Sequence, residues 1–214
     1  MSLIPRAARS WRCADLLIQF LDYLGVFVFA ITGALLASRK GMDVFGYVVL
    51  ALMPAVGGGT LRDLILDAPV FWIGDVTYLF ITLSAALICF LAHRHLAKRQ
   101  PVIVWFDAIG LSVFCVLGAS KALSLTQDAT VAVVMGVVTA VAGGIVRDVI
   151  ANEVPLILQK ELYATAAFFG ALALVLFDSW SVPGGAWLAV GIAFAVRSLG
   201  ILTGLSLPRS GASQ

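Results

Sequence analysis

The chain has 214 residues, of which 61% are hydrophobic and only 12% are charged, and its mean hydropathy is +1.03. A soluble domain carries roughly 25% charged residues, so this composition excludes a soluble globular protein and indicates a polytopic membrane protein. The net charge of +2 is too small to indicate a nucleic-acid partner, and the three cysteines lack the paired spacing of a disulfide framework.

Seven apolar stretches follow one another along the chain. A membrane-spanning helix needs about 20 apolar residues to cross a hydrocarbon core of about 30 Å. Three arginines precede the first stretch, as in a signal peptide, but an internal copy of that stretch argues against cleavage. The sequence therefore predicts an all-α integral membrane protein with seven transmembrane helices: Leu16–Ala37, Val44–Leu66, Val70–Ala92, Val102–Leu123, Ala129–Ala151, Leu162–Phe177 and Ala186–Thr203.

The internal copy relates the first three predicted helices to the next three. Because each copy holds an odd number of helices, the second must enter the membrane from the opposite side, which defines an inverted 3+3 repeat. We expect a first unit at 16–92, a second, inverted unit at 102–177 and one extra helix at 186–203. A shift of 85 positions without a gap aligns Asp22 with Asp107, Gly33 with Gly118, Asp43 with Asp128, Gly58-Gly59 with Gly143-Gly144, Arg62-Asp63 with Arg147-Asp148, and Tyr78 with Tyr163.

Lysines and arginines in the loops predict the orientation, because cytoplasmic loops carry an excess of both. The side with more of them would be cytoplasmic, which places the N-terminus outside and the C-terminus in the cytoplasm. One side collects Arg39, Lys40, Arg94, Lys98, Arg99, Lys160 and Arg209, and the other Arg6, Arg9, Arg12 and Lys121.

Glycine clusters interrupt the second and fifth predicted helices near their middle. A glycine costs about 1 kcal/mol in a helix interior, so a cluster needs a reason. Close packing through small residues is one reason, and a broken or kinked helix that lines a polar path is the other. The recurrence of the cluster before the same Arg-Asp pair favours the kinked helix. The residues are Gly57, Gly58 and Gly59 in the second helix and Gly143 and Gly144 in the fifth.

The Arg-Asp pairs that follow the glycines, Arg62-Asp63 and Arg147-Asp148, are the strongest candidates for pore-lining or gating charges. An arginine at mid-membrane costs from about 3 kcal/mol upward unless it finds a partner or water. Neighbouring residues on a helix point about 100° apart, so we expect each aspartate to contact a different element, such as the arginine of the opposite repeat. The alternative is that the charges lie near a helix end and extend to the interface.

Three further charges lie near predicted helix ends. Asp22 and Asp107 begin the first and fourth helices, where N-terminal capping and the helix dipole would explain them. The alternative is that these two carboxylates surround the two mouths of a cation path. Lys121 ends the fourth helix, opposite Leu36 in the repeat, either as an interfacial anchor or as a mobile charge at a pore mouth. His93 and His95 have no further ligand nearby, so no metal and no cofactor is expected.

The residues leave two functions open. A passive cation pore fits polar interruptions in both repeats, and a secondary transporter for a small anionic or zwitterionic solute, such as an amino acid, fits the inverted repeat equally well. An enzyme fits poorly, because no zinc motif, nucleophile triad or phosphate loop occurs.

The paired motifs GGGTLRD (57–63) and AGGIVRD (142–148), within seven predicted helices, resemble the trimeric intracellular cation (TRIC) channel family, in its short bacterial branch, over Asp15 to Gly204. The resemblance implies a homotrimer in a bacterial inner membrane. Each protomer would carry a potassium-permeable pore between its kinked second and fifth helices and its first and fourth. Potassium, sodium and membrane lipid are the implied partners. In animal relatives such arginines and a fourth-helix lysine contribute to lipid headgroup binding or gating, and Lys121 matches that lysine.

Overall fold

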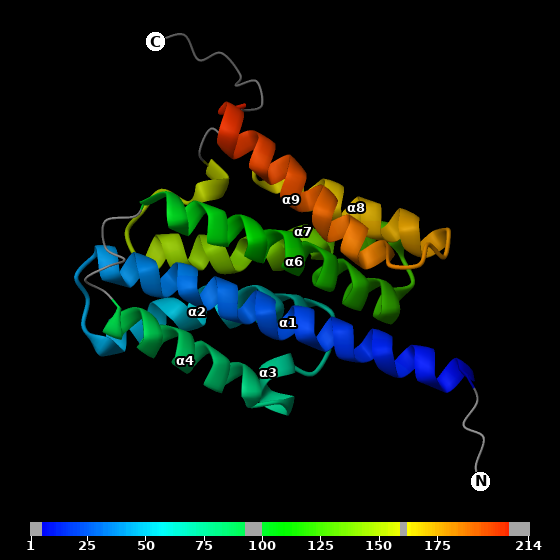
Figure 1. Cartoon of the computed structure of the whole chain (residues 1–214), viewed down its shortest axis with the longest axis horizontal. Coiled ribbons are helices and arrows are strands. Elements are labelled where there is room, and N and C mark those ends of the chain that lie inside the picture. The colour runs from blue at the N-terminus through cyan, green and yellow to red at the C-terminus, as the bar shows by residue number, and fades with distance from the viewer. Residues whose placement is uncertain (1–5, 93–99, 159–161, 206–214) are drawn as a thin grey trace.

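The computed structural model describes residues 6–92, 100–158 and 162–205, and this part of the chain is helical (Figure 1). The loop residues Arg94, Lys98, Arg99, Lys160 and Arg209, on which the predicted orientation depends, and also His93 and His95, lie outside the described residues. The elements are α1 (Arg6–Arg39), α2 (Val44–Ile65), α3 (Phe71–Gly74), α4 (Thr77–Leu91), α6 (Gln100–Thr126), α7 (Ala129–Ile150), the 3-10 helix η1 (Leu156–Leu158), α8 (Ala164–Ser179) and α9 (Gly185–Thr203).

Five of the described helices are long and apolar enough to cross a membrane: α1 (from Gln19), α2, α6 (from Val102), α7 and α9. The helices α4 and α8 are apolar but shorter. The predicted third helix, Val70–Ala92, is wrong in its extent, because the chain divides it into α3 and α4. Asp75 has extended backbone between the two and accepts a hydrogen bond from the Thr77 N–H at 2.9 Å, which starts α4 anew.

An aspartate starts both α2 and α7. Asp43 accepts from the Gly46 N–H at 2.8 Å, and Asp128 accepts from the Thr130 N–H at 2.7 Å and from the Val131 N–H at 3.0 Å. These carboxylates satisfy donors that have no partner within the first helical turn. The two caps are 85 residues apart, so the same local chemistry sets both starts.

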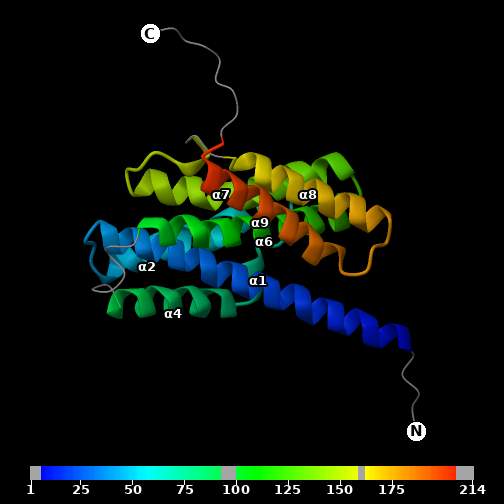
Figure 2. The same ribbon diagram turned by 45° about the horizontal axis from the view of Figure 1, so that its top comes forward.

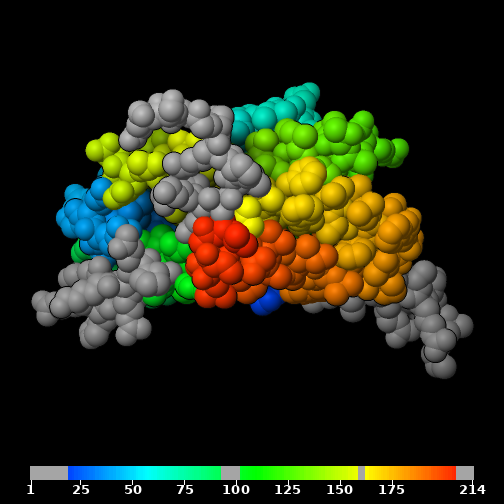
Figure 3. All heavy atoms as spheres, turned by 90° about the horizontal axis from the view of Figure 1, so that it is seen from above, coloured from blue at the N-terminus to red at the C-terminus, as the bar shows by residue number. Residues whose placement is uncertain are grey.

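The helices pack in equivalent pairs. The contacts join α1 to α6 and α2 to α7, while α4 flanks α1 and α2, and α8 and α9 flank α6 and α7 (Figures 1 and 2). In Figure 1, α1 runs from right to left and α6 from left to right. Phe29 and Phe114, which are 85 residues apart, stack between α1 and α6 with ring centroids separated by 5.1 Å. Figure 3 shows α8 and α9 side by side on one face of the molecule.

The glycine clusters lie where α2 crosses α7. A Cβ on Gly58 would lie 2.0 Å from the Thr139 carbonyl oxygen, and a Cβ on Gly143 would lie 2.6 Å from that of Pro54. The contact is reciprocal, because positions 54 and 139, like 58 and 143, are 85 apart. Both helices continue through the glycines, so neither helix is broken there, and the kink stays a prediction. Here the glycines allow two backbones to touch, as small residues do in membrane helix pairs.

Candidate functional site

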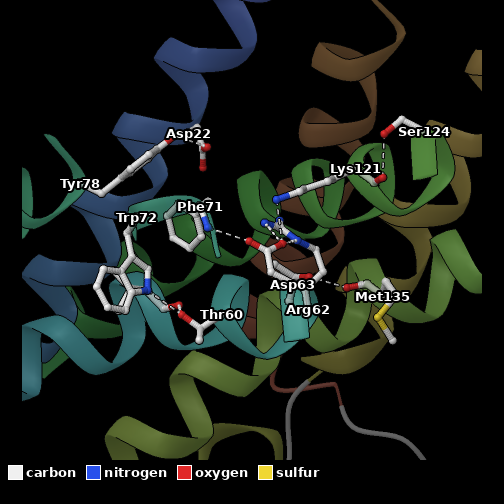
Figure 4. A network of polar contacts seen from close by, with 12 residues as sticks. Asp22, Thr60, Arg62, Asp63, Phe71, Trp72, Tyr78, Lys121, Ser124 and Met135 are labelled. Atoms are coloured by element: carbon white, nitrogen blue, oxygen red, sulfur yellow. Dashed lines mark hydrogen bonds and ion pairs between the residues drawn. The ribbon is translucent and has the colours of Figure 1, made fainter. Parts of the chain in front are cut away.

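The first charged cluster, Arg62, Asp63, Lys121, Asp22 and Tyr78, surrounds the end of α2. Asp63 is fully buried, and its Oδ1 lies 2.8 Å from both Nε and Nη2 of Arg62 and 2.8 Å from Nζ of Lys121 on α6 (Figure 4). Its Oδ2 accepts the backbone N–H of Phe71 at 3.0 Å. One carboxylate therefore joins α2, α6 and the start of α3.

The second charged cluster, Arg147, Asp148, Asp107, Thr32 and Tyr163, surrounds the end of α7. Arg147 is 1% exposed and donates from Nε to Asp148 Oδ1 at 2.8 Å. Its Nη1 donates to Asp107 on α6 at 2.7 Å and to the Thr32 hydroxyl on α1 at 2.9 Å. Asp148 Oδ2 accepts the Leu156 N–H at 3.1 Å, the counterpart of the contact between Asp63 and Phe71.

The expected partners of the Arg-Asp pairs require correction. Each arginine does contact the aspartate next to it, because its long side chain folds back along the helix. The partner of Asp63 from the opposite repeat is Lys121, not an arginine. Extension of the arginines to the interface is also wrong, since Arg62 and Arg147 are 6% and 1% exposed inside the protein.

The capping role predicted for Asp22 and Asp107 is wrong as well. The helices α1 and α6 begin at Arg6 and Gln100, so both aspartates lie beyond the first turn. Asp107 is fully buried against Arg147, and Asp22 accepts a hydrogen bond from the Tyr78 hydroxyl at 2.6 Å. In Figure 4, Asp22 and Tyr78 point toward one another beside Lys121.

A cavity of about 230 Å³ lies beside the first charged cluster. A water molecule takes about 30 Å³ of liquid volume, so this space admits several waters or a hydrated ion. The Lys121 side chain is 32% exposed in this space, whereas Asp63 behind it is closed off. The lining residues are Asp22, Arg62, Phe71, Leu117, Ser120, Lys121 and Ser124.

A second cavity, of about 130 Å³, lies beside the second charged cluster. Leu36 and Arg39 of α1 line it at the positions that Lys121 and Ser124 hold in the first cavity. Near its mouth Lys40 forms an ion pair with Glu153 at 2.7 Å, and the hydrogen bond from Lys40 lowers the pKa of Glu153. The remaining lining residues are Ile103, Val104, Arg147, Asp148, Glu153, Val154 and Leu156.

Sequence reasoning did not include four site residues: Thr32, Tyr78, Tyr163 and Arg197. The 85-residue shift aligns the two tyrosines, and that signal could have placed them beside the aspartates. Arg197 is the one charged residue in the sequence of α9 and is fully buried there, with its guanidinium 4.9 Å from the Tyr163 ring centroid. Nothing in the local pattern identifies Thr32. Among the described residues, no three His, Cys, Asp or Glu side chains gather as metal ligands.

The chain has relatives of known sequence and structure. A family model described as "Glycine transporter" matches residues 19–94 and again 104–179, two stretches that are also offset by 85 residues. The inner membrane protein YadS of Escherichia coli K12 is 40% identical over 199 residues, which are 90% of this chain and 96% of that protein. A membrane protein of Vibrio cholerae is 44% identical over 162 residues, 73% of this chain and 66% of its own length.

The fold also matches a crystal structure of the TRIC channel orthologue from Rhodobacter sphaeroides. The TM-score is 0.82 at 42% identity, and the match covers 88% of this chain and 99% of that one. The helical fold, the doubled motif and these matches define an integral membrane protein whose matching family model and solved structures are those of transporters and channels. The chain belongs to the trimeric intracellular cation channel family, and it is a multi-pass inner membrane protein.

Proposed function

We propose that the protein is a potassium-permeable cation channel that assembles as a homotrimer with one pore in each protomer. The observation that carries the proposal is the pair of polar cavities on the two charged clusters. One cavity lies at the C-terminal ends of α2 and α6, and the other at the C-terminal ends of α1 and α7. In Figure 1 these ends lie on opposite sides of the molecule, as two vestibules of one path would.

The crossing of α2 and α7 separates the two vestibules. Gly57, Gly58 and Gly143 allow the helices to meet there without side chains between them, while the adjacent Gly59 and Gly144 face Phe71 and the Tyr163 hydroxyl. Small movements of the two helices at this contact would widen a path, because no bulky side chain has to leave it. We propose that these glycines form the constriction of the pore.

The charged clusters form the walls on either side of this constriction. Arg62, Asp63 and Lys121 line the path toward one vestibule, and Arg147 and Asp148 line it toward the other. Asp22 lines the first cavity, and Asp107, at the equivalent position, is buried behind Arg147. We propose that their negative charges favour cations on the two sides of the path. The C-terminus is proposed to face the cytoplasm, with the N-terminus outside, and bilayer lipids contact the apolar outer faces of the helices.

Ion flux tests the proposal. Purified protein in proteoliposomes is expected to pass potassium down its gradient, and planar-bilayer recording is expected to show discrete unitary currents. Arg62→Ala and Arg147→Ala should alter or abolish these currents while Thr203→Ala, at the exposed end of α9, leaves them unchanged. Absence of potassium flux from a folded wild-type trimer would reject the channel.

A carrier for a small zwitterionic solute is the second candidate: the matching family model is described as "Glycine transporter", although the matching solved structures are cation channels. The free amino acid glycine would suit such a carrier, because the buried arginines and carboxylates offer partners for its carboxylate and its ammonium group. Radiolabelled glycine should then exchange across the membrane with saturation and counterflow. Saturating exchange without unitary currents would establish the carrier in place of the channel.

A further inference from the structure

The two charged clusters differ in the source of their cations. In the first, Arg62 and Lys121 face the two carboxylates Asp63 and Asp22. In the second, Arg147 is the one cation among the described residues that contacts the two carboxylates, Asp107 and Asp148. The position that corresponds to Lys121 is Leu36, which is buried and carries no charge. Without another cation, the second cluster would hold one excess negative charge.

The extra helix α9 brings a second cation to this place. Arg197 is fully buried and its guanidinium lies 4.9 Å from the centre of the Tyr163 ring. Gly200, one turn farther along α9, keeps this contact close, since a Cβ there would lie 3.1 Å from Leu162 Cβ. Arg39 also lines the second cavity, but it is exposed to solvent and its charge is screened.

Tyr163 connects Arg197 to the cluster. A Cβ built on Gly144 would lie 3.0 Å from the Tyr163 hydroxyl, 3.8 Å from Asp107 Oδ1 and 3.9 Å from Arg147 Nη2. Tyr163, Asp107 and Arg147 thus converge on one glycine, and Arg197 covers the tyrosine ring from the side of α9. The interior offers little solvent screening, so a cation one ring away acts on the cluster.

We propose that Arg197 is the balancing cation of the second charged cluster, where it takes the part that Lys121 takes in the first. The helix outside the repeat thereby completes a site inside the repeat. In the channel of the proposed function, on which this consequence rests, Arg197 determines how tightly a permeating cation is held beside Asp107 and Asp148. It is a positioning residue, since it acts through Tyr163 and through its charge.

A thermal double-mutant cycle tests the charge balance without any transport measurement. Arg197→Met keeps much of the side-chain volume and removes the charge, and it should lower the Tm of the detergent-purified trimer. Asp107→Asn should also lower the Tm in the wild-type background, since it weakens the contact with Arg147. In the Arg197→Met background, Asp107→Asn should instead restore part of the lost Tm. Arg197→Lys should have a Tm close to that of the wild type. Equal losses in both backgrounds would overturn the proposal.

Conductance gives the second readout. Arg197→Gln leaves a net negative charge beside the path, so potassium should saturate the current at a concentration roughly tenfold lower than in wild type. Arg197→Lys should retain the wild-type concentration, and Ser198→Ala, in the same turn of α9, should not change it. An unchanged saturation in folded Arg197→Gln would contradict the role of Arg197. If wild type carries no current at all, the proposed function fails, and the stability cycle still decides the charge balance.

Discussion

Nζ of Lys121 lies 2.8 Å from Oδ1 of Asp63, so a lysine of α6 forms an ion pair with the aspartate of the glycine-arginine motif on α2. The two ends of this pair differ in environment. Asp63 is fully buried and keeps Arg62 and the Phe71 N–H as partners, whereas Lys121 is one-third exposed to the cavity. Lys121 is therefore the residue of the first charged cluster whose side chain can move away from Asp63 with the smallest loss of free energy.

Removal of Lys121 is predicted to change permeation more than stability. Lys121→Gln leaves Asp63 paired with Arg62, so the free energy of unfolding should fall by only about 1 kcal/mol. The loss of a positive charge from the cavity wall should raise unitary potassium conductance severalfold. Single-channel recording measures this, with Thr203→Ala, at the exposed end of α9, as the control outside both cavities. A folded Lys121→Gln channel with wild-type conductance would contradict the prediction.

The two motif arginines are predicted to differ in their effect on stability. Arg147→Met leaves two buried carboxylates, Asp107 and Asp148, without this partner, and breaking such a buried pair costs about 3–5 kcal/mol. Arg62→Met should cost less, because Lys121 remains on Asp63. Thermal unfolding in detergent compares the two variants, and Asp107→Asn should recover part of the loss in Arg147→Met. Equal losses for both arginines would argue against the difference between the clusters.

Two adjacent glycines offer a matched test of the helix crossing. A Cβ on Gly58 would collide with the Thr139 carbonyl oxygen at 2.0 Å, whereas a Cβ on Gly57 would only reach the Gly143 Cα at 3.8 Å. Gly58→Ala should therefore destabilise the protein by about 1–3 kcal/mol through overpacking. Gly57→Ala should be neutral or stabilising, because alanine is the better helix former. The Tm of both variants measures the difference, and similar values for the two would contradict a close backbone contact.

The ion pair between Lys40 and Glu153 should make stability depend on pH in acid. The hydrogen bond from Lys40 holds the pKa of Glu153 below its ordinary value of 4.5. The pair therefore contributes fully above pH 4.5, and its contribution is lost as pH falls through the lowered pKa of the folded state. The Tm difference between wild type and Glu153→Gln should narrow over that interval. The effect is small because both side chains are about one-third exposed, and a difference independent of pH would contradict it.

Much of the helical fold followed from hydropathy and from local capping chemistry. The predicted bounds of the second and fifth helices, Val44–Leu66 and Ala129–Ala151, agree with α2 and α7 within one residue. Both helices start at an aspartate cap, which is local chemistry that a sequence displays. The third predicted helix failed because the mean hydropathy of Val70–Ala92 hides the interruption at Asp75.

The sequence indicated which residues belong to the candidate site better than it indicated which residues they contact. Charged residues in apolar helices identified Arg62, Asp63, Arg147, Asp148 and Lys121. Their partners depend on how far each side chain reaches and on which helix lies opposite. Helical periodicity argued against contact between adjacent residues, but the length of an arginine side chain overrides it. Only the packing of the helices identifies Thr32 and Arg197 as site residues, since neither belongs to a sequence motif.

The helices α4 and α8 contain 15 and 16 residues. At 1.5 Å per residue they are roughly 22 and 24 Å long, which is shorter than a hydrocarbon core of about 30 Å. Lipids beside these two helices must compress to cover them, and such mismatch costs a fraction of a kcal/mol for each ångström. The bilayer around the protein should therefore be locally thin at two places on its perimeter. The acyl-chain length of the surrounding lipids would then affect the stability of the protein directly, and lipids with shorter chains would stabilise it.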